Sequence, residues 1–540
     1  MARLPLAVSL CALALAALAP AASASTDMQV GIADDGVTQR LPQLAPDTIR
    51  DWKNVGVEVT RVMAIWEYLA PAKESATAPA GFDPTDPNDP AYNWGPLDQT
   101  IDLLRQRGIE PIVSITGPAP VWGSQFPARR NGRYKPDPAK FGQFATAVAR
   151  RYAGRVNRFI IWNEPNLPNW LQPQFSCSGK RCKPASPAIY RELWKAAVPN
   201  VREAIPGASI YLGSTASRGD NATSANSSMR PLLWLRSLGC INKSLRRDNS
   251  TAGCATAGTI TTDGISYHPH TRVAPPSVRF KNPDEAGIAD TGRLLRTVDA
   301  MQRAGTVENH AAPGQRFNLF YTEWGYQTNP PDPFSGVSFA EQSRWLQQGA
   351  YMAWRQPRVK LLVQYLWRDD PVRDKGQGPS AYSGWQSGLY LYDGRRKPSR
   401  ETWPQPFWAS LPKGSREAFL WGQVKPGGAH EVTIERKLGS GGYRALTKLT
   451  TDASGYFTLR TPVSGKASFR FSWTGSDTGG PDRRMVSSSV VIVPAVAQPA
   501  VELSRRRLLL MHPSERSQSR GRIDELAEVA LSPREAVEPR

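Results

Sequence analysis

The stretch RFIIWNEPN (158–166) joins a short apolar run to a polar turn, and FYTEWG (320–325) does the same later in the chain. Runs rich in β-branched and aromatic residues favour buried strands. In each stretch a glutamate follows the run directly: Glu164, preceded by Asn163, in the first and Glu323 in the second. The two stretches therefore predict buried strands that end in carboxylates.

Similar apolar runs recur from about residue 28 to 410 and alternate with stretches of helical period. We expect eight strands, at 28–33, 57–65, 110–116, 158–162, 209–212, 264–267, 318–322 and 360–366. Helices are expected at 96–107, 138–152 with Asp137 as N-cap, 189–205, 290–304 and 339–355. This pattern predicts a (β/α)8 TIM barrel. The alternative is an open doubly wound sheet, but no G-x-G-x-x-G motif opens any of the first helices.

Beyond residue 412 the pattern changes to alternating segments separated by Gly, Ser and Asp turns, which predicts an all-β sandwich. Its strands are expected at 424–437, 443–450, 455–461 and 467–473. The expected division is a signal peptide at 1–24, a catalytic barrel at 25–412, a β-sandwich domain at 413–495 and a disordered tail at 496–540.

The first residues have the features of a secretory signal: Arg3, an apolar run from Leu4 to Leu18, and a small-residue cleavage site at 22–24. A retained N-terminal anchor is the alternative. Cleavage would make the protein extracellular and would remove Cys11. The four other cysteines are then expected to form two short-loop disulfides, Cys177–Cys182 and Cys240–Cys254. A zinc site at the first pair is disfavoured because no histidine lies nearby.

The formal net charge of +20 over 540 residues suits an anionic cell envelope, an acidic glycan or nucleic acid. The basic residues are spread along the chain and no nucleic-acid-binding motif accompanies them, so a nucleic-acid partner is not expected. No later stretch is long and apolar enough for membrane insertion. A solvated basic surface is the simplest interpretation of the charge.

Counting strands places Glu164 after the fourth strand and Glu323 after the seventh, so the two carboxylates should face each other across the mouth of the barrel. Glycoside hydrolysis uses such a pair. The motifs IWNEPNL (161–167) and TEWG (322–325) resemble those of clan A retaining glycoside hydrolases, most closely family 39, with family 5 next. The resemblance covers about residues 28–405.

The resemblance implies that Glu164 is the general acid/base and Glu323 the nucleophile, and that no metal or other cofactor is needed. Asn163 would bind the sugar hydroxyl next to the anomeric carbon. Arg61 matches a basic residue that related enzymes direct at the nucleophile. His268 and His270 are expected in the substrate site, and His270 stands where the family usually has a tyrosine. A metal at His268-x-His270 is disfavoured, because the other histidines lie far from the strand ends.

Trp367, just after the eighth strand, is where clan A enzymes place an aromatic platform for a sugar ring. Other tryptophans that could line the site or pack in the core are Trp66, Trp122, Trp170 and Trp324. The expected function is a secreted retaining glycosidase that acts on a poly- or oligosaccharide. The alternatives are a non-catalytic carbohydrate-binding or cell-surface barrel, and a transglycosylase.

Overall fold

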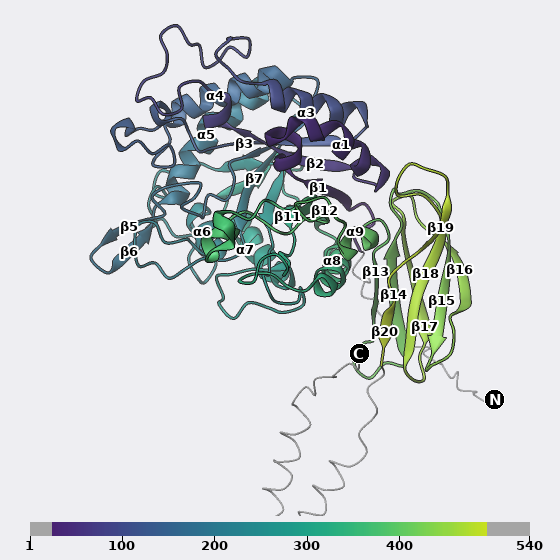
Figure 1. The fold of residues 1–540 in the computed structure, drawn as a ribbon. Coiled ribbons are helices and arrows are strands. Elements are labelled where there is room, and N and C mark those ends of the chain that lie inside the picture. The colour runs from purple at the N-terminus through teal and green to yellow at the C-terminus, as the bar shows by residue number, and fades with distance from the viewer. Residues whose placement is uncertain (1–23, 494–540) are drawn as a thin grey trace, which may run out of the picture.

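The protein, described over residues 24–493 by a computed structural model, contains a closed barrel of eight parallel strands (Figure 1). Around the barrel the strands follow the order β1-β12-β11-β9-β7-β4-β3-β2. Their bounds are β1 Gln29–Ala33, β2 Val59–Ile65, β3 Glu110–Thr116, β4 Arg158–Ile161, β7 Ser209–Ala216, β9 Gly264–His268, β11 Leu319–Trp324 and β12 Val359–Tyr365. The predicted (β/α)8 barrel is confirmed, and the open sheet is excluded because β1 pairs with both β2 and β12.

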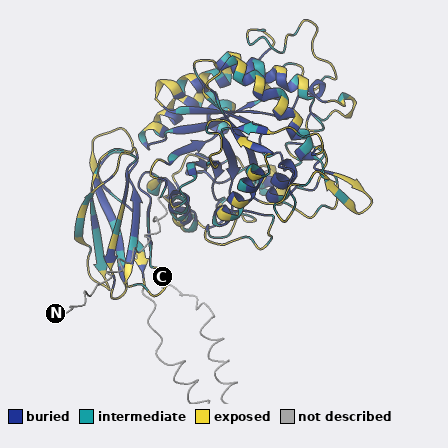
Figure 2. Ribbon diagram, turned by 180° about the vertical axis from the view of Figure 1, so that it is seen from behind, coloured by how far each residue is buried: buried dark blue, intermediate teal, exposed yellow. Residues whose placement is uncertain are grey.

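The barrel strands are mostly buried, as their dark colour at the centre of Figure 2 shows. A cluster of buried apolar side chains fills the inside of the barrel. Ile160 on β4, Tyr211 on β7 and Phe320 on β11 belong to this inner cluster, and the last two rings stack at 4.1 Å. Gly264 on β9 leaves room for them, because a Cβ there would lie 2.4 Å from the Phe320 ring. The barrel is therefore a packed core that carries its site at one end.

Helices surround the strands: α1 Ala45–Asn54, α3 Gly95–Gln106, α4 Pro138–Tyr152, α5 Ser186–Ala204, α6 Pro231–Leu238, α7 Thr291–Arg303 and α8 Phe339–Trp354. Asp137 caps α4 as predicted, since its carboxylate accepts the Ala139 and Lys140 N–H groups. Helices α1 and α6 are not among those predicted from the sequence. With 8 residues, α6 is shorter than the window of about 11–18 residues in which a helical period is recognised.

The strands β4, β7, β9, β11 and β12 end at other residues than predicted, by one or two residues except at β7. The fourth ends at Ile161, because Trp162 turns the chain with a φ of 71°. The fifth, β7, continues past Leu212 to Ala216 through a register shift at Gly213 and Ser214, both of which have positive φ. A bulge of this kind re-aims side chains at the rim of a barrel.

Two antiparallel sheets follow the barrel. One contains β13 Phe407–Ser410, β14 Glu417–Gln423 and β17 Tyr456–Pro462, and the other contains β15 Glu431–Leu438, β16 Arg444–Thr450, β18 Ala467–Gly475, β19 Arg483–Val486 and β20 Val490–Ile492. The first sheet begins at Phe407, before the expected boundary at 412. The segment expected as one strand at 424–437 begins with a turn at Lys425–Gly428, and only 431 onward is extended.

The sandwich covers part of the barrel wall. The last barrel helix, α9, is only the short segment Pro398–Thr402. Trp421 and Tyr456 of the sandwich belong to the same buried cluster as the barrel core, and the Tyr456 hydroxyl donates to the Met28 carbonyl at 3.0 Å. The sandwich thus shields the outer face of β12 and β1 from solvent, as a longer eighth helix would otherwise do.

Both predicted disulfides are present, Cys177–Cys182 across the hairpin of β5 (Phe175–Ser178) and β6 (Arg181–Pro184), and Cys240–Cys254. No helix within residues 24–493 is long and apolar enough to span a bilayer. The expected signal peptide, apart from its last residue, and the expected tail at 496–540 lie outside the described residues.

Candidate active site

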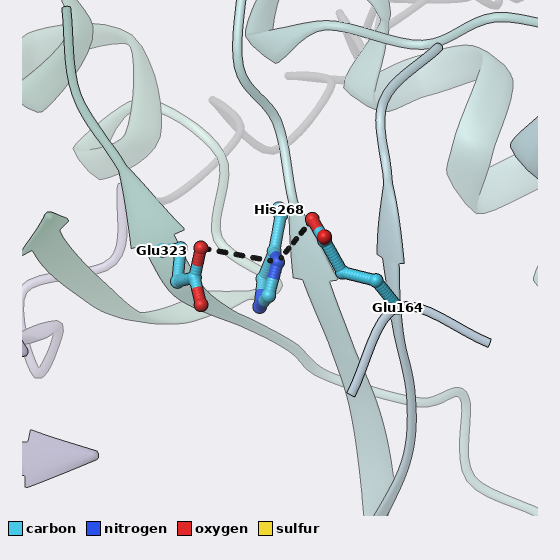
Figure 3. Close-up of side chains that lie close together, drawn as sticks. All are labelled: Glu164, His268 and Glu323. Carbon is cyan, nitrogen blue, oxygen red and sulfur yellow. Dashed lines mark hydrogen bonds and ion pairs between the residues drawn. The ribbon is translucent and has the colours of Figure 1, made fainter. Parts of the chain in front are cut away.

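Glu164 and Glu323 come together at the carboxyl ends of the barrel strands (Figure 3). Glu164 follows β4, and Glu323 is the next-to-last residue of β11. His268, the last residue of β9, lies between them. One ligand atom from each of these three side chains lies within 4.8 Å of the others. The sequence prediction that the fourth and seventh strands place two carboxylates face to face agrees with this geometry.

The backbone around Glu164 is held in an unusual conformation. Trp162 and Glu164 have φ values of 71° and 38°, a region that costs a residue with a side chain on the order of 1–3 kcal/mol. The Glu164 N–H donates to the Ser214 carbonyl at 3.1 Å on neighbouring β7. Asn166 binds the same strand, because its amide oxygen accepts the Ala216 N–H. These contacts fix the turn that directs Glu164 into the cleft.

Arg61 on β2 forms a buried ion pair with the nucleophile candidate. Its Nη2 lies 2.8 Å from Glu323 Oε1, and neither side chain is more than 6% exposed. An arginine stays charged at all working pH values, so this contact favours the ionised form of Glu323.

The two histidines contact the carboxylates differently. His268 Nδ1 lies 3.0 Å from Glu164 Oε1 and 3.5 Å from Glu323 Oε2. His270 Nε2 lies 3.7 Å from Glu323 Oε2 only, and its ring packs on Trp385 with centroids 4.8 Å apart. His268 therefore bridges the two carboxylates, whereas His270 stands beside Glu323.

The electrostatics give the two glutamates different protonation states. Burial raises the pKa of Glu164 to about 7, against the opposing effects of His270 and Arg61. Burial would also raise the pKa of Glu323, but His268 and Arg61 outweigh it and the pKa falls below its ordinary value. At mildly acidic pH, Glu164 is a protonated acid beside an ionised Glu323.

His268 remains neutral in this site. Burial lowers its pKa to about 3, although the Glu323 carboxylate opposes the shift. A neutral imidazole can either donate or accept at Nδ1. His268 can therefore stay hydrogen-bonded to Glu164 whether that carboxyl is protonated or ionised.

A cavity of about 650 Å³ opens over the pair. Asn163, Glu164 and Glu323 line it together with Trp170 and Tyr365. The side-chain oxygen of Asn163 is buried and has no hydrogen-bond partner within the described chain, so it can receive a hydroxyl of a ligand. Tyr365 and Trp170 were not among the expected catalytic or platform residues, although Trp170 was one of several tryptophans considered.

Trp367 does not reach this cavity. Its side chain is 5% exposed, packs on Tyr390 at 4.8 Å between ring centroids, and lies under the Arg400 guanidinium. Its backbone N–H donates to the Asp34 carboxylate at 3.2 Å. Trp66, Trp122 and Trp324 are buried as well, and Trp324 fills the space above Gly349 on α8.

Trp385 occupies the place expected for a platform. It lies in the loop after β12, is partly exposed, and lines both the 650 Å³ cavity and a smaller neighbouring cavity. Asp370 accepts the Trp385 N–H at 3.1 Å, and the buried Lys397–Asp369 pair, at 2.7 Å, fixes the same loop. No local pattern in the sequence marks Trp385, because this loop has no regular period.

The smaller cavity, of about 240 Å³, shares Glu164, Leu167 and Trp385 with the larger one. It extends toward β7 and β9, where Arg218 and Arg272 line it, whereas Glu323 lines only the larger cavity. The cleft therefore has two arms that meet at Glu164.

Glu164, His268 and Glu323 offer oxygen and nitrogen ligands that could hold a metal ion. The Arg61 guanidinium, 2.8 Å from Glu323, places a fixed positive charge against one of these ligands. That charge opposes a cation, so the arrangement favours chemistry by the carboxylates themselves.

No protein-family model matches the chain, and no curated protein is significantly similar to it. Among solved structures, the glucosidase from Croceicoccus marinus is 12% identical, with 82% of this chain and 94% of that chain covered and a TM-score of 0.47. A family 30 subfamily 8 xylanase from Clostridium acetobutylicum is also 12% identical, with 82% and 95% covered and a TM-score of 0.38.

A psychrophilic family 10 endo-β-1,4-xylanase is 14% identical, with 69% of this chain and 94% of that chain covered and a TM-score of 0.36. All three are glycoside hydrolases by name, and the resemblance to family 39 stays a prediction. At such low identities the chemistry of this chain has to be argued from its own site.

Proposed function

We propose that this protein is a retaining glycoside hydrolase that cleaves O-glycosidic bonds in a poly- or oligosaccharide. The observation that carries the proposal is the Glu164–Glu323 pair, in which one carboxyl has its pKa raised to about 7 while Arg61 keeps the other ionised. Two carboxyl groups with separated pKa values are what glycoside hydrolysis requires.

In the first step, Glu323 attacks the anomeric carbon while Glu164 gives its proton to the departing glycosidic oxygen. The bond from anomeric carbon to that oxygen breaks as the bond to the Glu323 carboxylate forms. In the second step, Glu164, now ionised, takes a proton from water, and the oxygen of that water displaces Glu323. The sugar leaves with its original anomeric configuration.

The short spacing of the pair favours this double displacement. Retaining enzymes place their carboxyl groups about 5–5.5 Å apart, whereas inverting enzymes need about 6.5–9.5 Å to admit a water molecule. One carboxylate oxygen of Glu164 and one of Glu323 lie within 4.8 Å of each other. Asn163, beside Glu164, is positioned to bind a hydroxyl of the reacting sugar.

Secretion of the protein belongs to the same proposal. The expected signal sequence and the two disulfides support an oxidising, extracellular location. The polymer that is cleaved would then lie outside the cell or on its surface.

The test begins with aryl glycosides and a panel of neutral and acidic oligosaccharides, analysed for reducing ends and product mass. E164Q should lower kcat by about 10²–10⁴-fold, and E323Q should lower it at least as much. Glu192, exposed on α5 and paired with Lys195, offers the matched control E192Q, which should keep full activity. Longer products in the panel would indicate transglycosylation.

Azide rescue distinguishes the acid/base residue from the nucleophile. In E164A, azide should take the place of water, attack the glycosyl-enzyme and give a glycosyl azide of retained configuration. In E323A it should replace the nucleophile and give the inverted azide. Proton NMR of the first wild-type products should show retention, and net inversion, or full activity of E323Q, would overturn the proposal.

A further inference from the structure

The two arms of the cleft differ in which of the two catalytic glutamates line them. Glu323, which attacks the anomeric carbon, lines only the 650 Å³ arm, so the sugar that becomes attached must lie there. Glu164, which protonates the oxygen between the two sugars, lines both arms. The 240 Å³ arm, which contains Glu164 but not Glu323, therefore receives the leaving group.

This second arm is lined by positive charge. Arg218 and Arg272 both face it, and the only carboxylate in its lining is Glu164, which is neutral when it acts as an acid. Gln327 and Ser335 add neutral polar groups, and Trp385 adds an aromatic wall.

The arginine charges are only partly balanced by nearby acids. Arg218 lies 3.9 Å from Glu285, and Arg230 lies 3.9 Å from the same carboxylate oxygen, so one negative charge serves two guanidinium groups. Arg272 donates to the neutral Ser335 hydroxyl at 3.4 Å. Its backbone has a φ of 57°, a conformation that a residue with a side chain seldom adopts and that recurs at ligand sites.

We infer that the leaving-group arm binds an anionic sugar, with Arg218 and Arg272 holding a carboxylate or sulfate on the residue that departs. A planar guanidinium offers paired N–H donors that match either group. The inference rests on the proposed glycosidase function and specifies its substrate: a glycan with an acidic residue on the reducing side of the cleaved bond. It also assigns a function to two of the basic residues that contribute to the net charge of +20.

The experiment compares two aryl glycosides of the same sugar, one with a 4-nitrophenol leaving group and the other with a 3-carboxy-4-nitrophenol leaving group. The wild-type protein should show a higher kcat/KM for the carboxylated substrate, and added salt should reduce this preference. In the double variant R218Q/R272Q the ratio of the two kcat/KM values should fall by about tenfold. Intrinsic leaving-group reactivity cancels when the ratio is compared between variants.

Arg105, exposed on the outer helix α3, provides the matched control R105Q, which removes one positive charge from the same barrel away from the cleft. This variant should keep the wild-type ratio. Thermal unfolding by circular dichroism verifies that both variants are folded. A wild-type protein without preference, or a double variant with an unchanged ratio, would contradict the inference.

A binding measurement separates this inference from the proposed activity. Isothermal titration compares a tetrasaccharide of alternating hexuronic acid and neutral sugar with the same tetrasaccharide after reduction of its carboxyl groups to alcohols. If neither aryl glycoside is hydrolysed, the glycosidase proposal fails. Tighter binding of the acidic form that depends on Arg218 and Arg272 still supports the anionic arm, whereas equal or absent binding overturns it.

Discussion

Glu164 and Glu323 differ by their surroundings rather than by their chemistry. Glu164 lies in a desolvated turn where its charge is disfavoured, whereas Glu323 lies against a permanently charged arginine. Under the proposed function, two identical side chains would thereby take the opposite roles of acid and nucleophile. The pH dependence of the reaction should reveal both environments.

We predict a bell-shaped pH profile of kcat/KM. Activity should rise as Glu323 ionises, below the ordinary glutamate range, and fall as Glu164 loses its proton near pH 7. R61M removes the charge beside Glu323, so the pKa of Glu323 should rise and the acidic limb should move to higher pH. Initial rates on an aryl glycoside from pH 3 to 9 measure both limbs.

R61K is the matched variant, because it keeps a positive charge on the same strand. Its acidic limb should lie closer to the wild-type position than that of R61M. Since Arg61 is buried, unfolding curves must accompany the rates. A folded R61M with an unshifted acidic limb would show that Arg61 does not control Glu323.

Among the elements of the fold, the loop after β12 places an aromatic side chain in the cleft. It carries Trp385 into the cleft, and the buried Lys397–Asp369 pair anchors it. Trp367, at the start of the same loop, is buried in the wall instead. Trp385 is thus placed to contact a ligand, whereas Trp367 packs in the barrel wall.

We predict that W385A and W367A affect different measurements. W385A should raise KM by about tenfold, equal to about 1.4 kcal/mol, through loss of a stacking surface, with little change in stability. W367A should lower the free energy of unfolding by about 3–5 kcal/mol through the cavity that it creates. Steady-state kinetics and denaturant unfolding of both variants test this. Equal effects of the two variants on KM would contradict the assignment.

The elements that could be predicted from sequence are those with a local signal. Glu164 and Glu323 follow apolar strands directly, so strand counting was enough to bring them together. Asp137 has the capping position that its residue type favours. Trp385, Arg218 and Arg272 lie in loops without a period, and their places depend on tertiary contacts such as that of Asp370 with Trp385. Helix α6 was missed because its 8 residues are too few to show a helical period over a window of about 11–18 residues.

In the whole molecule, barrel and sandwich share part of one hydrophobic cluster through Trp421 and Tyr456, while the sandwich keeps a second cluster of its own around Phe469 and Phe471. Trp354 at the end of α8 packs on Trp421 of β14, with ring centroids 5.9 Å apart. Arg400 and Asp477 form a buried ion pair across the boundary, at 2.9 Å. Sequence periodicity shows where the helix–strand pattern of the barrel gives way to the alternating pattern of the sandwich. It cannot show that the barrel and the sandwich pack against each other.

We predict that barrel and sandwich unfold as one unit and that R400M lowers the free energy of unfolding by about 3 kcal/mol, because it leaves Asp477 without its buried partner. This loss of stability is at the low end of the range for breaking a buried ion pair, because Arg483 also contacts Asp477 at 3.1 Å and would remain as its partner. Denaturant unfolding followed by fluorescence and by activity measures both claims. R444M, at an exposed position on β16, should leave stability unchanged. Two separate wild-type transitions would contradict the shared core.

The short α9, and the sandwich that compensates for it, have a practical consequence. Any ligand that binds only the folded protein raises its melting temperature, in proportion to the logarithm of ligand concentration over Kd. If the core is continuous, a sugar in the cleft protects the sandwich as well as the barrel. Unfolding of the sandwich, around Trp421 and Trp473, then reports on carbohydrates bound in the cleft of the barrel. A glycan library could be screened in this way with the inactive E323Q protein, before any substrate is known.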